Sequence, residues 1–475
     1  MSNIFDIDEN RAKCQKFTPE KMVAKLLEII DYSTDLYGKK VLENSFGNGN
    51  ILIAIVEKYI KECLKCGLEK KQISSGLADD IIGIELDQKL FCDTLDRLNC
   101  LADKYELPKV NWNIHNYDAL KYKYNVVFDY IIGNPPYISY KQIDTDNRNY
   151  LRTIFKSCQK GKFDYCYAFV ELGISLLSEE GKMVQLVPSN IFKNVFAKHL
   201  RELMFPHISE IYEYPSKVLF ESTLTSSCIF LYDKSNNDDV VKYYNITDST
   251  SNIVNKIFLS EKWMFTENIP SNDDKSLRFG DYYDASIVIA TLCNEAFIVS
   301  EKNIKENNLE KELIRHAVSP RSLRYKKQEY IIFPYRYEND KLKKYSSEDF
   351  LLKFPNIGRY LNRYRKELDN RNSDNSAKWF EYGRSQALSH LNCEKLLLST
   401  IVTDSVNLYV LDSDTIPYSG IYIYPKTDEY DLDFAKQILK SPEFMDYVKK
   451  IGIPVSGTSI RITCNDIKNY KFTRR

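Results

Sequence analysis

Apolar runs alternate with helical stretches over the first half of the chain. The segments 41–42, 81–84, 111–114 and 126–132 each predict a strand, and the last of them a buried one. Between them, stretches such as 51–59 carry apolar residues at the spacing of one helix face. Strands that alternate with helices in this way predict an α/β domain with a doubly wound, Rossmann-like sheet.

Acidic residues follow three of the predicted strands. Glu43 opens a Gly47-x-Gly49 turn after the first strand, Glu85 ends the second, and Asp118 follows the third. The turn lacks the third glycine of a dinucleotide fingerprint and the Lys-Ser/Thr of a phosphate-binding loop. An acid at Glu43 suits a cationic amino acid, Glu85 suits a ribose diol, and Asp118 suits an adenine amino group. Leu86, beside Glu85, could cover a purine face.

The fourth strand runs into a rigid corner, Asn134-Pro135-Pro136-Tyr137. The two prolines remove backbone donors, so that carbonyl groups can point outward beside the Asn134 side chain. Two neighbouring acceptors and an exposed Tyr137 ring suit a planar substrate with an exocyclic amino group, such as an adenine taken out of a helix. The plainer interpretation is an ordinary Asn-Pro turn.

The segment Phe17-Thr18-Pro19 precedes the first predicted helix. Thr18 fits the N-cap position and Pro19 the first helical turn. A helix start that contacts a small ligand through Thr18 remains an equal alternative on this segment alone.

The second part of this domain is predicted less regularly. Residues 138–161 form a long polar and aromatic segment, which we interpret as a substrate lid. A helix from Phe163 should end at Gly181, a strand should follow at 183–188, and the last strand should end at Leu231. We therefore expect a catalytic domain at 1–240 and a mixed α+β domain at 241–475.

Basic and aromatic residues are interleaved in the C-terminal half. Residues 311–327 hold six Lys or Arg against one acid, and residues 353–384 hold eight against four. Such runs are usually solvated surface, but in a nucleic-acid enzyme they suit phosphate and base-edge contacts. The candidate DNA-binding residues are Arg321, Arg324, Arg363, Arg365 and Arg384.

Composition narrows the class of protein. The 475 residues are 43% hydrophobic and 28% charged, with 66 basic and 66 acidic residues, as in a globular protein of two or three domains. No apolar run reaches the roughly 18 residues of a membrane span, so we expect a cytoplasmic protein without membrane contacts. Eleven scattered Cys and five His form no zinc pattern, and we expect no metal.

These motifs together resemble the N6-adenine DNA methyltransferases of the γ arrangement, which are TaqI-like or Eco57I-like. Residues 15–20 match the family's first cofactor motif, 43–49 its glycine loop, and 134–137 its catalytic tetrapeptide. Residues 163–169 resemble the segment whose aromatic residue packs on the cofactor. Phe46, Asn48 and Glu43 depart from commoner residues without removing the chemistry. The segments 379–384, 395–401 and 451–457 look like the family's target recognition domain.

The resemblance implies a class I fold that binds S-adenosylmethionine, and a duplex DNA substrate. The cofactor residues would be Phe17, Thr18, Pro19, Glu43, Gly47, Gly49, Glu85, Leu86, Asp118 and Phe169. The catalytic residues would be Asn134, Pro135, Pro136 and Tyr137, with Tyr137 and Phe220 stacking on the flipped adenine.

Other assignments remain open at this point. RNA and protein-glutamine methyltransferases also use such a corner, and a DNA-binding subunit could retain an inactive fold. A C-terminal half of this size and Phe220 favour DNA over a glutamine substrate. Only 16 residues precede Phe17, so we expect no fused N-terminal nuclease and a restriction endonuclease, if present, on a separate chain. We expect a monomer, because one recognition domain can read an asymmetric site.

Overall fold

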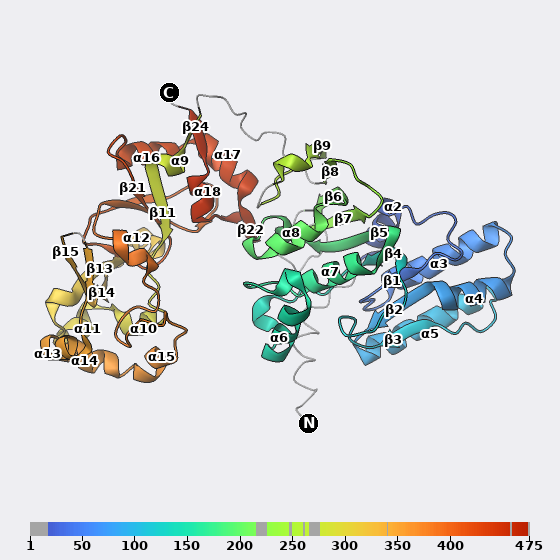
Figure 1. Ribbon diagram of the computed structural model, residues 1–475, viewed down its shortest axis with the longest axis horizontal. Helices are drawn as coiled ribbons and strands as arrows, with labels where there is room; N and C mark the ends of the chain where they lie inside the picture. The colour runs from blue at the N-terminus through green and yellow to red at the C-terminus, as the bar shows by residue number, and fades with distance from the viewer. Residues whose placement is uncertain are drawn as a thin grey trace. The chain divides into compact units, whose positions relative to one another are not determined.

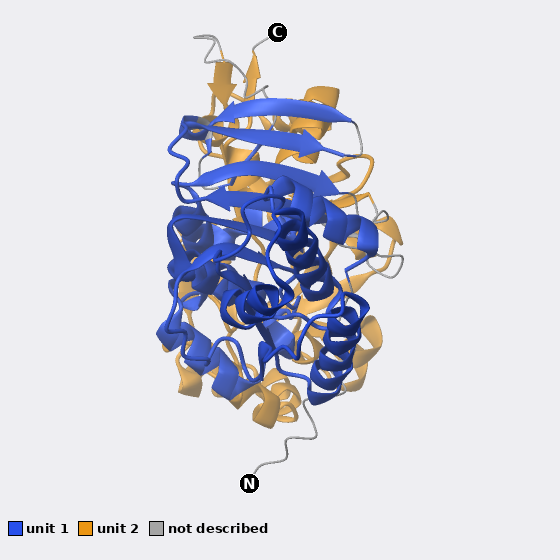
Figure 2. Cartoon of the chain, turned by 90° about the vertical axis from the view of Figure 1, so that its right-hand side faces the viewer, with its two compact units in different colours: residues 1–269 blue, residues 270–475 orange. Residues whose placement is uncertain are grey.

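The computed structural model describes residues 18–214, 226–246, 249–259, 262–265, 276–339, 341–456 and 458–473. The chain forms two compact units, residues 1–269 and 270–475 (Figures 1 and 2). Within the described ranges, we find no helix that combines the length and the apolar character needed to cross a bilayer.

Unit 1 is built on one large sheet with helices on both faces (Figure 1). Its strands are β1 (Val41–Glu43), β2 (Ile81–Glu85), β3 (Asn113–Asn116), β4 (Phe128–Gly133), β5 (Leu177–Pro188), β6 (Ile208–Tyr214), β7 (Ser227–Asp233), β8 (Val240–Asn245) and β9 (Thr250–Asn255). Its helices are α2 (Glu20–Ile29), α3 (Asn50–Lys65), α4 (Lys70–Asp80), α5 (Gln88–Lys104), α6 (Thr145–Ile154), α7 (Cys166–Leu176) and α8 (Lys198–Met204). Short 3₁₀ turns lie at η2 (Tyr140–Gln142), η3 (Lys156–Cys158), η4 (Ser189–Phe192), η5 (Val195–Ala197) and η6 (Lys256–Phe258).

The strand order is β3-β2-β1-β4-β5-β7-β6-β8-β9. The first five strands are parallel, and β7 lies antiparallel between β5 and β6. The chain reverses direction across the sheet between β1 and β4, which are neighbours. A ligand in an open α/β sheet binds at such a switch point, beyond the carboxyl ends of the strands.

Two apolar layers hold this sheet between the helices. Side chains of successive strand residues point to opposite faces, so Val41 packs with α2–α5 while Leu42 packs with α6–α8. Ile131 and Ile132 divide in the same way between the two layers. Burial on both faces explains why these strands read as continuous apolar runs in the sequence.

The predicted α/β fold of the N-terminal half is confirmed, with shifts at some element ends. The second strand has the predicted bounds, whereas the third and fourth lie later than predicted, at Asn113–Asn116 and Phe128–Gly133. Val126 and Val127 are apolar but exposed, because they precede β4. A prediction from apolar character alone therefore began the fourth strand two residues too early.

Two expectations at the end of unit 1 were wrong. Helix α7 ends at Leu176, and Gly181 lies inside β5. A Cβ at Gly181 would lie 2.7 Å from the Phe128 carbonyl oxygen, so the glycine permits the close approach of β4. The units divide at Ile269 and Pro270 instead of at 240, because β8 and β9 extend the same sheet beyond β6.

Residues 138–162, the predicted lid, are mostly helical. They contain η2, α6 and η3, and Asp144 caps α6 by accepting a hydrogen bond from the Asn147 N–H at 2.9 Å. Leu151 and Phe155 are buried in the layer formed with α7. The segment is thus a small packed subdomain next to the carboxyl end of β4.

Unit 2 is a mixed α+β unit with two four-stranded sheets, ordered β11-β21-β17-β19 and β12-β14-β13-β20, and smaller sheets. Its strands are β10 (Ser276–Arg278), β11 (Tyr283–Ile287), β12 (Ile298–Val299), β13 (Ile314–Val318), β14 (Glu329–Ile332), β15 (Tyr335–Glu338), β16 (Lys341–Lys344), β17 (Lys395–Leu398), β18 (Ile401–Val402), β19 (Leu408–Leu411), β20 (Ile416–Pro417), β21 (Ile421–Pro425), β22 (Ile453–Ser456), β23 (Ser459–Arg461) and β24 (Lys471–Thr473). Its helices are α9 (Phe279–Tyr282), α10 (Asn294–Phe297), α11 (Glu301–Glu306), α12 (Pro320–Arg324), α13 (Ser347–Lys353), α14 (Pro355–Asn362), α15 (Arg365–Asp369), α16 (Leu432–Lys440), α17 (Pro442–Ile451) and α18 (Cys464–Lys468), with 3₁₀ turns η7 (Lys311–Leu313) and η8 (Gln386–His390).

Most of the aromatic residues interleaved with basic ones belong to the core of unit 2. Tyr360 and Tyr382 are buried, and the Tyr382 hydroxyl donates to the Ile332 carbonyl at 2.8 Å. Tyr325 differs, because its side chain is 70% exposed directly after α12. The expectation that these aromatics form a nucleic-acid surface as a group was therefore wrong.

Candidate functional site: a polar pocket at the switch point

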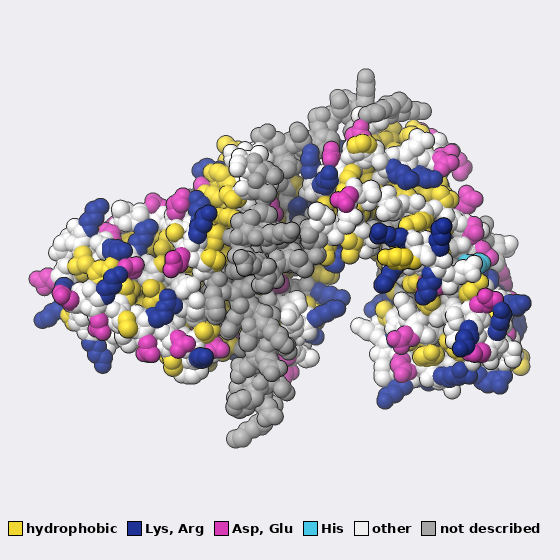
Figure 3. Space-filling view, turned by 180° about the vertical axis from the view of Figure 1, so that it is seen from behind, with side chains coloured by type: hydrophobic (Ala, Val, Ile, Leu, Met, Phe, Trp, Pro, Cys, Tyr) yellow, Lys and Arg dark blue, Asp and Glu magenta, His cyan; other side chains and the backbone are white. Residues whose placement is uncertain are grey.

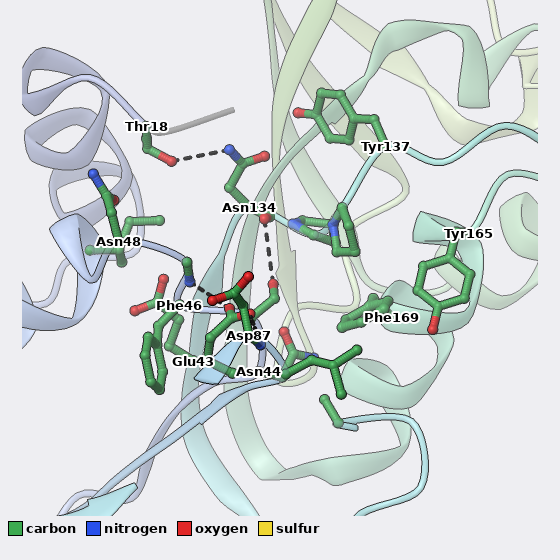
Figure 4. A pocket seen from close by; sticks show the side chains of 18 of the residues that line it. Thr18, Glu43, Asn44, Phe46, Asn48, Asp87, Asn134, Tyr137, Tyr165 and Phe169 are labelled. Carbon is green, nitrogen blue, oxygen red and sulfur yellow. Dashed lines mark hydrogen bonds between the residues drawn. The ribbon is translucent and has the colours of Figure 1, made fainter. Parts of the chain in front are cut away.

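A pocket lies beyond the carboxyl ends of β1, β2 and β4 and holds about 1160 Å³ of space, including its open side (Figure 4). It is lined by residues from the glycine turn, the strand ends, the tetrapeptide and α7. The lining residues are Thr18, Glu43–Asn48, Asn50, Ile51, Glu85–Asp87, Tyr117–Ala119, Asn134–Ile138, Tyr165 and Phe169. The topology thus brings together most of the candidates that the sequence places far apart.

The Asn134 side chain is oriented by Thr18. Its Nδ2 donates a hydrogen bond to Thr18 Oγ1 at 3.1 Å, and Thr18 itself is buried. Figure 4 shows the Asn134 nitrogen turned to Thr18 and the oxygen on the opposite side of the amide. The sequence predicted that Thr18 caps α2, and this prediction was wrong. Pro19 occupies the cap position, without a side-chain hydrogen bond. The alternative interpretation, a ligand-site residue at the start of α2, fits this arrangement.

The remaining tetrapeptide residues form one wall of the pocket. Pro135, Pro136 and Tyr137 all line it. The sequence predicted an exposed Tyr137 ring, but the ring is half-buried. Its hydroxyl donates a hydrogen bond to the Leu186 carbonyl of β5 at 3.0 Å. This bond fixes the ring at the pocket wall, and burial raises the pKa of the hydroxyl well above its ordinary value.

The glycine turn is held by Glu85. One carboxylate oxygen accepts the Gly47 N–H at 2.8 Å, and the other accepts the Asp87 N–H at 2.8 Å. Burial raises the pKa of Glu85, and these backbone donors oppose the shift. Gly49, the second glycine of the turn, allows close packing. It has φ +77° at the N-cap of α3, and a Cβ there would overlap the side chain of Thr94.

Glu43 and Asn44 are buried polar side chains without full hydrogen bonding. Glu43 is 1% exposed and Asn44 is 2% exposed. Among the residues that the structure describes, Glu43 Oε2 and both polar atoms of the Asn44 amide have no hydrogen-bond partner. Burial and then the charge of Glu85 raise the pKa of Glu43 well above its ordinary value. A ligand with a cationic group and further polar groups would satisfy these atoms.

An apolar and acidic end of the pocket lies beyond Glu85. Leu86 is 42% exposed and faces the pocket, together with the buried ring of Phe169. Asp118 accepts the Leu120 N–H through one oxygen at 3.1 Å and lies 3.3 Å from Lys121 Nζ through the other. Apolar surfaces beside a polar acceptor suit a flat heterocycle with an amino group.

Two predicted site residues, Phe17 and Phe220, lie outside the described residues. Sequence reasoning missed Asn44 and Tyr165. Asn44 directly follows the strand-ending Glu43, so its position was a usable signal. Tyr165 was not recognisable as a wall residue, because its place depends on its N–H donating to the Ile138 carbonyl at 2.9 Å.

The five arginines proposed for DNA binding differ in their surroundings. Arg321 and Arg324 are both exposed on α12, and Arg363 is exposed at the end of α14. Arg365 is paired with Asp369 at 2.7 Å, and Arg384 is paired with Asp374 at 2.8 Å. Lys, Arg, Asp and Glu side chains are interspersed on the face seen in Figure 3.

Comparison with known proteins identifies the class of unit 1. Residues 5–220 match the model of the Eco57I restriction-modification methylase family. Unit 1 therefore resembles this family over most of its length. Its match covers the glycine turn, Glu85, Asp118 and the tetrapeptide.

Relatives of the family cover different parts of the chain. The Type II restriction enzyme and methyltransferase RM.Eco57I of Escherichia coli is 24% identical over 406 residues, which are 72% of this chain and 40% of that protein. The Type II methyltransferase M.BstVI of Geobacillus stearothermophilus is 26% identical over 200 residues, 40% of this chain and 36% of that protein. The chain therefore spans less than half the length of each of these two relatives.

A solved structure shares the fold over both units. The Type IIL restriction-modification enzyme MmeI, determined in complex with DNA, matches with a TM-score of 0.59 at 13% identity. The alignment covers 98% of this chain and 65% of MmeI. At this identity the likeness concerns the fold alone.

Proposed function

We propose that the chain transfers a methyl group from S-adenosylmethionine to the N6 amino group of an adenine flipped out of duplex DNA. The observation that carries the proposal is the Asn134 amide, oriented by Thr18 at the wall of a pocket that also holds two buried acids. The match to a restriction-modification methylase family supports DNA as the substrate.

The described residues fit S-adenosylmethionine through their unsatisfied atoms. Glu43 Oε2 and the Asn44 amide lack partners in a buried region, which suits the ammonium and other polar groups of the methionine part. Glu85, which closes the adjacent turn, would accept the ribose hydroxyls. Leu86 and Phe169 would cover the adenine ring, and Asp118 would accept its amino group.

Asn134 and Pro135 would activate the target base. An adenine amino nitrogen is a weak nucleophile because its lone pair is delocalised into the ring. Asn134 Oδ1 and the Pro135 carbonyl would accept its two N–H bonds and favour a tetrahedral nitrogen. Because these acceptors are already fixed, they need no reorganisation during the reaction.

Bound S-adenosylmethionine supplies an electrophilic methyl group on its sulfonium. Tyr137 would hold the target base by stacking, and its hydroxyl bond to Leu186 keeps the ring in place. Such stacking contributes about 1–3 kcal/mol per base. The added proton leaves the nitrogen after transfer, so this mechanism requires no dedicated general base.

Unit 2 would supply the contacts that select a DNA sequence. The support is its mixed α+β architecture, shared over most of the chain with a restriction-modification enzyme determined on DNA. The exposed arginines Arg321 and Arg324 are the foremost candidates for phosphate contacts. A restriction endonuclease would be the functional partner.

The decisive experiment measures the transfer of labelled methyl groups from S-adenosylmethionine to unmethylated genomic DNA. The nucleosides of that DNA are then analysed for the label. We expect the label in N6-methyladenine, and sequencing of the same DNA then gives the site. Label in another nucleoside would contradict adenine specificity, and label only in RNA or protein would contradict the substrate class. Asn134→Ala serves as the inactive control.

A further inference from the structure

Two loops of unit 1 leave the sheet beside the pocket. Residues 138–162 follow β4, and residues 189–198 follow β5. These strands are parallel neighbours, with Gly133 paired to Gln185, so their carboxyl ends meet at one edge of the sheet. The tetrapeptide occupies this same edge, which places both loops next to the proposed base-binding wall.

Both loops are basic in a chain whose formal net charge is zero. Residues 138–162 contain six Lys or Arg against two acids, Asp144 and Asp146, and residues 189–198 contain two Lys and no acid. The acids in or next to the loops are already engaged: Asp144 caps α6, Glu171 accepts two backbone N–H groups at 2.8 and 2.9 Å, and Glu202 pairs with His199 at 2.9 Å. Asp164 accepts the Cys166 N–H at 3.2 Å. Asp146 is the exception, because it is exposed in the first turn of α6.

Five cations of these loops form what we call the basic face: Arg148, Arg152, Lys160, Lys162 and Lys198. Within the described ranges, none of them is paired with a carboxylate. Arg148 and Arg152 lie over the Tyr140 ring, with the guanidinium carbons 4.5 and 5.5 Å from its centroid. They also donate to carbonyl groups of Tyr140 and Gly161 at 3.0 and 3.3 Å. The two guanidinium groups are therefore held in place while their charge remains uncompensated.

An apolar tip, Val195 and Phe196, accompanies the basic face. Val195 is 60% exposed and Phe196 is 41% exposed. The tip is firmly supported: Asn194 accepts the Phe196 N–H at 3.1 Å, and buried Arg201 donates to the Asn194 carbonyl at 2.8 Å. Phe196 also packs against Gly161, where a Cβ would overlap its ring, so the tip joins the two loops.

Phe192 of the same loop shows the contrast with the tip. It is buried, and its ring stacks on Trp263 with centroids 5.7 Å apart. The loop thus turns one aromatic residue into the core and presents two apolar residues outward. Apolar side chains held rigidly in a polar, basic surface are typical of a contact site.

We propose that the basic face binds the phosphates flanking the target adenine, and that the apolar tip packs against the bases left exposed when the adenine is flipped out. This inference rests on the proposed function and adds a specific DNA contact on unit 1. Duplex DNA carries one negative charge per about 1.7 Å of axis, which suits cations without internal partners. Removing a base from the stack leaves an apolar gap, and apolar side chains insert as wedges between base steps in other DNA complexes.

The basic face is tested with the triple variant Lys160→Ala, Lys162→Ala, Lys198→Ala. We expect duplex affinity to fall by at least about tenfold at fixed salt, and the slope of log affinity against log salt to fall by about 2–3. Binding of S-adenosylmethionine should be unchanged. The matched control is Lys65→Ala, Lys71→Ala, exposed lysines at the opposite end of α3 and on α4. An unchanged slope in the triple variant, or an equal loss in the control, would overturn the phosphate contact.

The apolar tip is tested with Val195→Ser and Phe196→Leu on DNA that carries 2-aminopurine at the target position. We expect less fluorescence from the flipped 2-aminopurine, and slower methylation of the same duplex with adenine at that position, with little change in duplex affinity. A mismatched target pair costs less to open, so it should restore the rate of both variants. A rate that the mismatch does not restore would indicate a loss of structure only and would contradict the wedge.

Failure of this inference is distinguishable from failure of the proposed function. If the unaltered chain methylates DNA while both sets of variants behave like it, only the DNA contact on unit 1 is wrong. If the unaltered chain transfers no label to DNA, the proposed function is wrong, and the variants cannot be what removed the activity.

Discussion

Buried polar side chains differ in their hydrogen bonding between the pocket of unit 1 and the core of unit 2. In the pocket, Glu43 and Asn44 are almost fully buried and keep atoms without hydrogen-bond partners. In unit 2, Lys395 is 0% exposed, but its ammonium donates to the carbonyls of Leu391, Cys393 and Asp412 at 2.7–2.9 Å. Burial of polar groups is thus not itself the mark of a site.

The difference shows what each buried group does. A buried polar atom without a partner costs about 1–3 kcal/mol, which the fold must offset elsewhere. At Lys395 this cost is met within the protein, so the side chain stabilises unit 2. At Glu43 and Asn44 it is left to a ligand. The four predictions below test this contrast.

The largest effect should come from Asn134→Ala. The variant removes an acceptor that acts on the reacting nitrogen, so we expect methyl transfer to fall by about 10²–10³-fold. Affinity for S-adenosylmethionine, measured by calorimetry, should stay within about twofold. Thr18→Val keeps the amide but removes its hydrogen-bond partner, and an intermediate rate is expected. Full activity of Asn134→Ala would refute the mechanism.

Lys395→Met should mainly affect the folding of unit 2. It leaves three carbonyls without their common donor, and we expect a loss of about 3–5 kcal/mol in the free energy of unfolding. Hydrogen exchange of the β17 amides should report this loss, while the cofactor still binds to unit 1. Lys440→Met, at an exposed position on α16, is the control and should change little. Loss of cofactor binding in Lys395→Met would break the comparison.

Glu43→Gln should have opposite effects on stability and binding. The pKa of Glu43 is raised in the folded chain, so the unfolded chain loses this proton first as the pH rises above about 4.5. Stability is therefore reduced at neutral pH, and the uncharged amide should recover about 1–2 kcal/mol. Affinity for S-adenosylmethionine should fall by about tenfold or more.

The pH dependence sharpens this prediction. In the unaltered chain, affinity for a cationic ligand should increase as the pH rises through the raised pKa of Glu43 and its carboxyl ionises. Glu43→Gln should flatten much of this increase, leaving the part due to Glu85. Dissociation constants and melting temperatures measured on both chains over the same pH series check both signs. A variant that melts lower at pH 7 and binds the cofactor equally well would contradict the assignment.

The smallest effect should distinguish the arginines of unit 2. Arg321→Ala with Arg324→Ala removes two exposed cations of α12, and we expect the salt slope of DNA binding to fall by about 2. Arg365→Ala with Arg384→Ala removes two cations already paired with Asp369 and Asp374, so the slope should fall by less than 1. Equal slopes for the two variants, from filter binding over a salt series, would show that pairing does not decide which arginine contacts DNA.

The order of the elements around the pocket was predictable from the sequence because each site residue directly follows a strand. Glu43, Glu85 and Asn134 end β1, β2 and β4 or follow them directly, and parallel strands necessarily align these ends. The orientation of Asn134 was not predictable, because its partner Thr18 lies 116 positions away in the sequence.

Two wrong predictions from the sequence, for Gly181 and for the aromatic residues of unit 2, arise because each residue contacts a distant part of the chain. Gly181 predicted a helix end, but its role is to let the Phe128 carbonyl approach β5. The buried aromatics of unit 2, such as Tyr382, have the same composition pattern as a nucleic-acid surface, and only packing separates the two. Where a residue acts through a distant neighbour, local sequence carries too little information.

The β8–β9 hairpin affects how specificities could be exchanged between relatives. If the chain is cut at residue 240, the edge of β6 is left open and Phe192 loses its stacking partner Trp263. Such an unpaired edge invites other chains to add to it, and aggregation follows. A chimera that joins a foreign unit 2 at Pro270 keeps the whole sheet intact. A junction placed after the hairpin could therefore combine one unit 1 with different versions of unit 2.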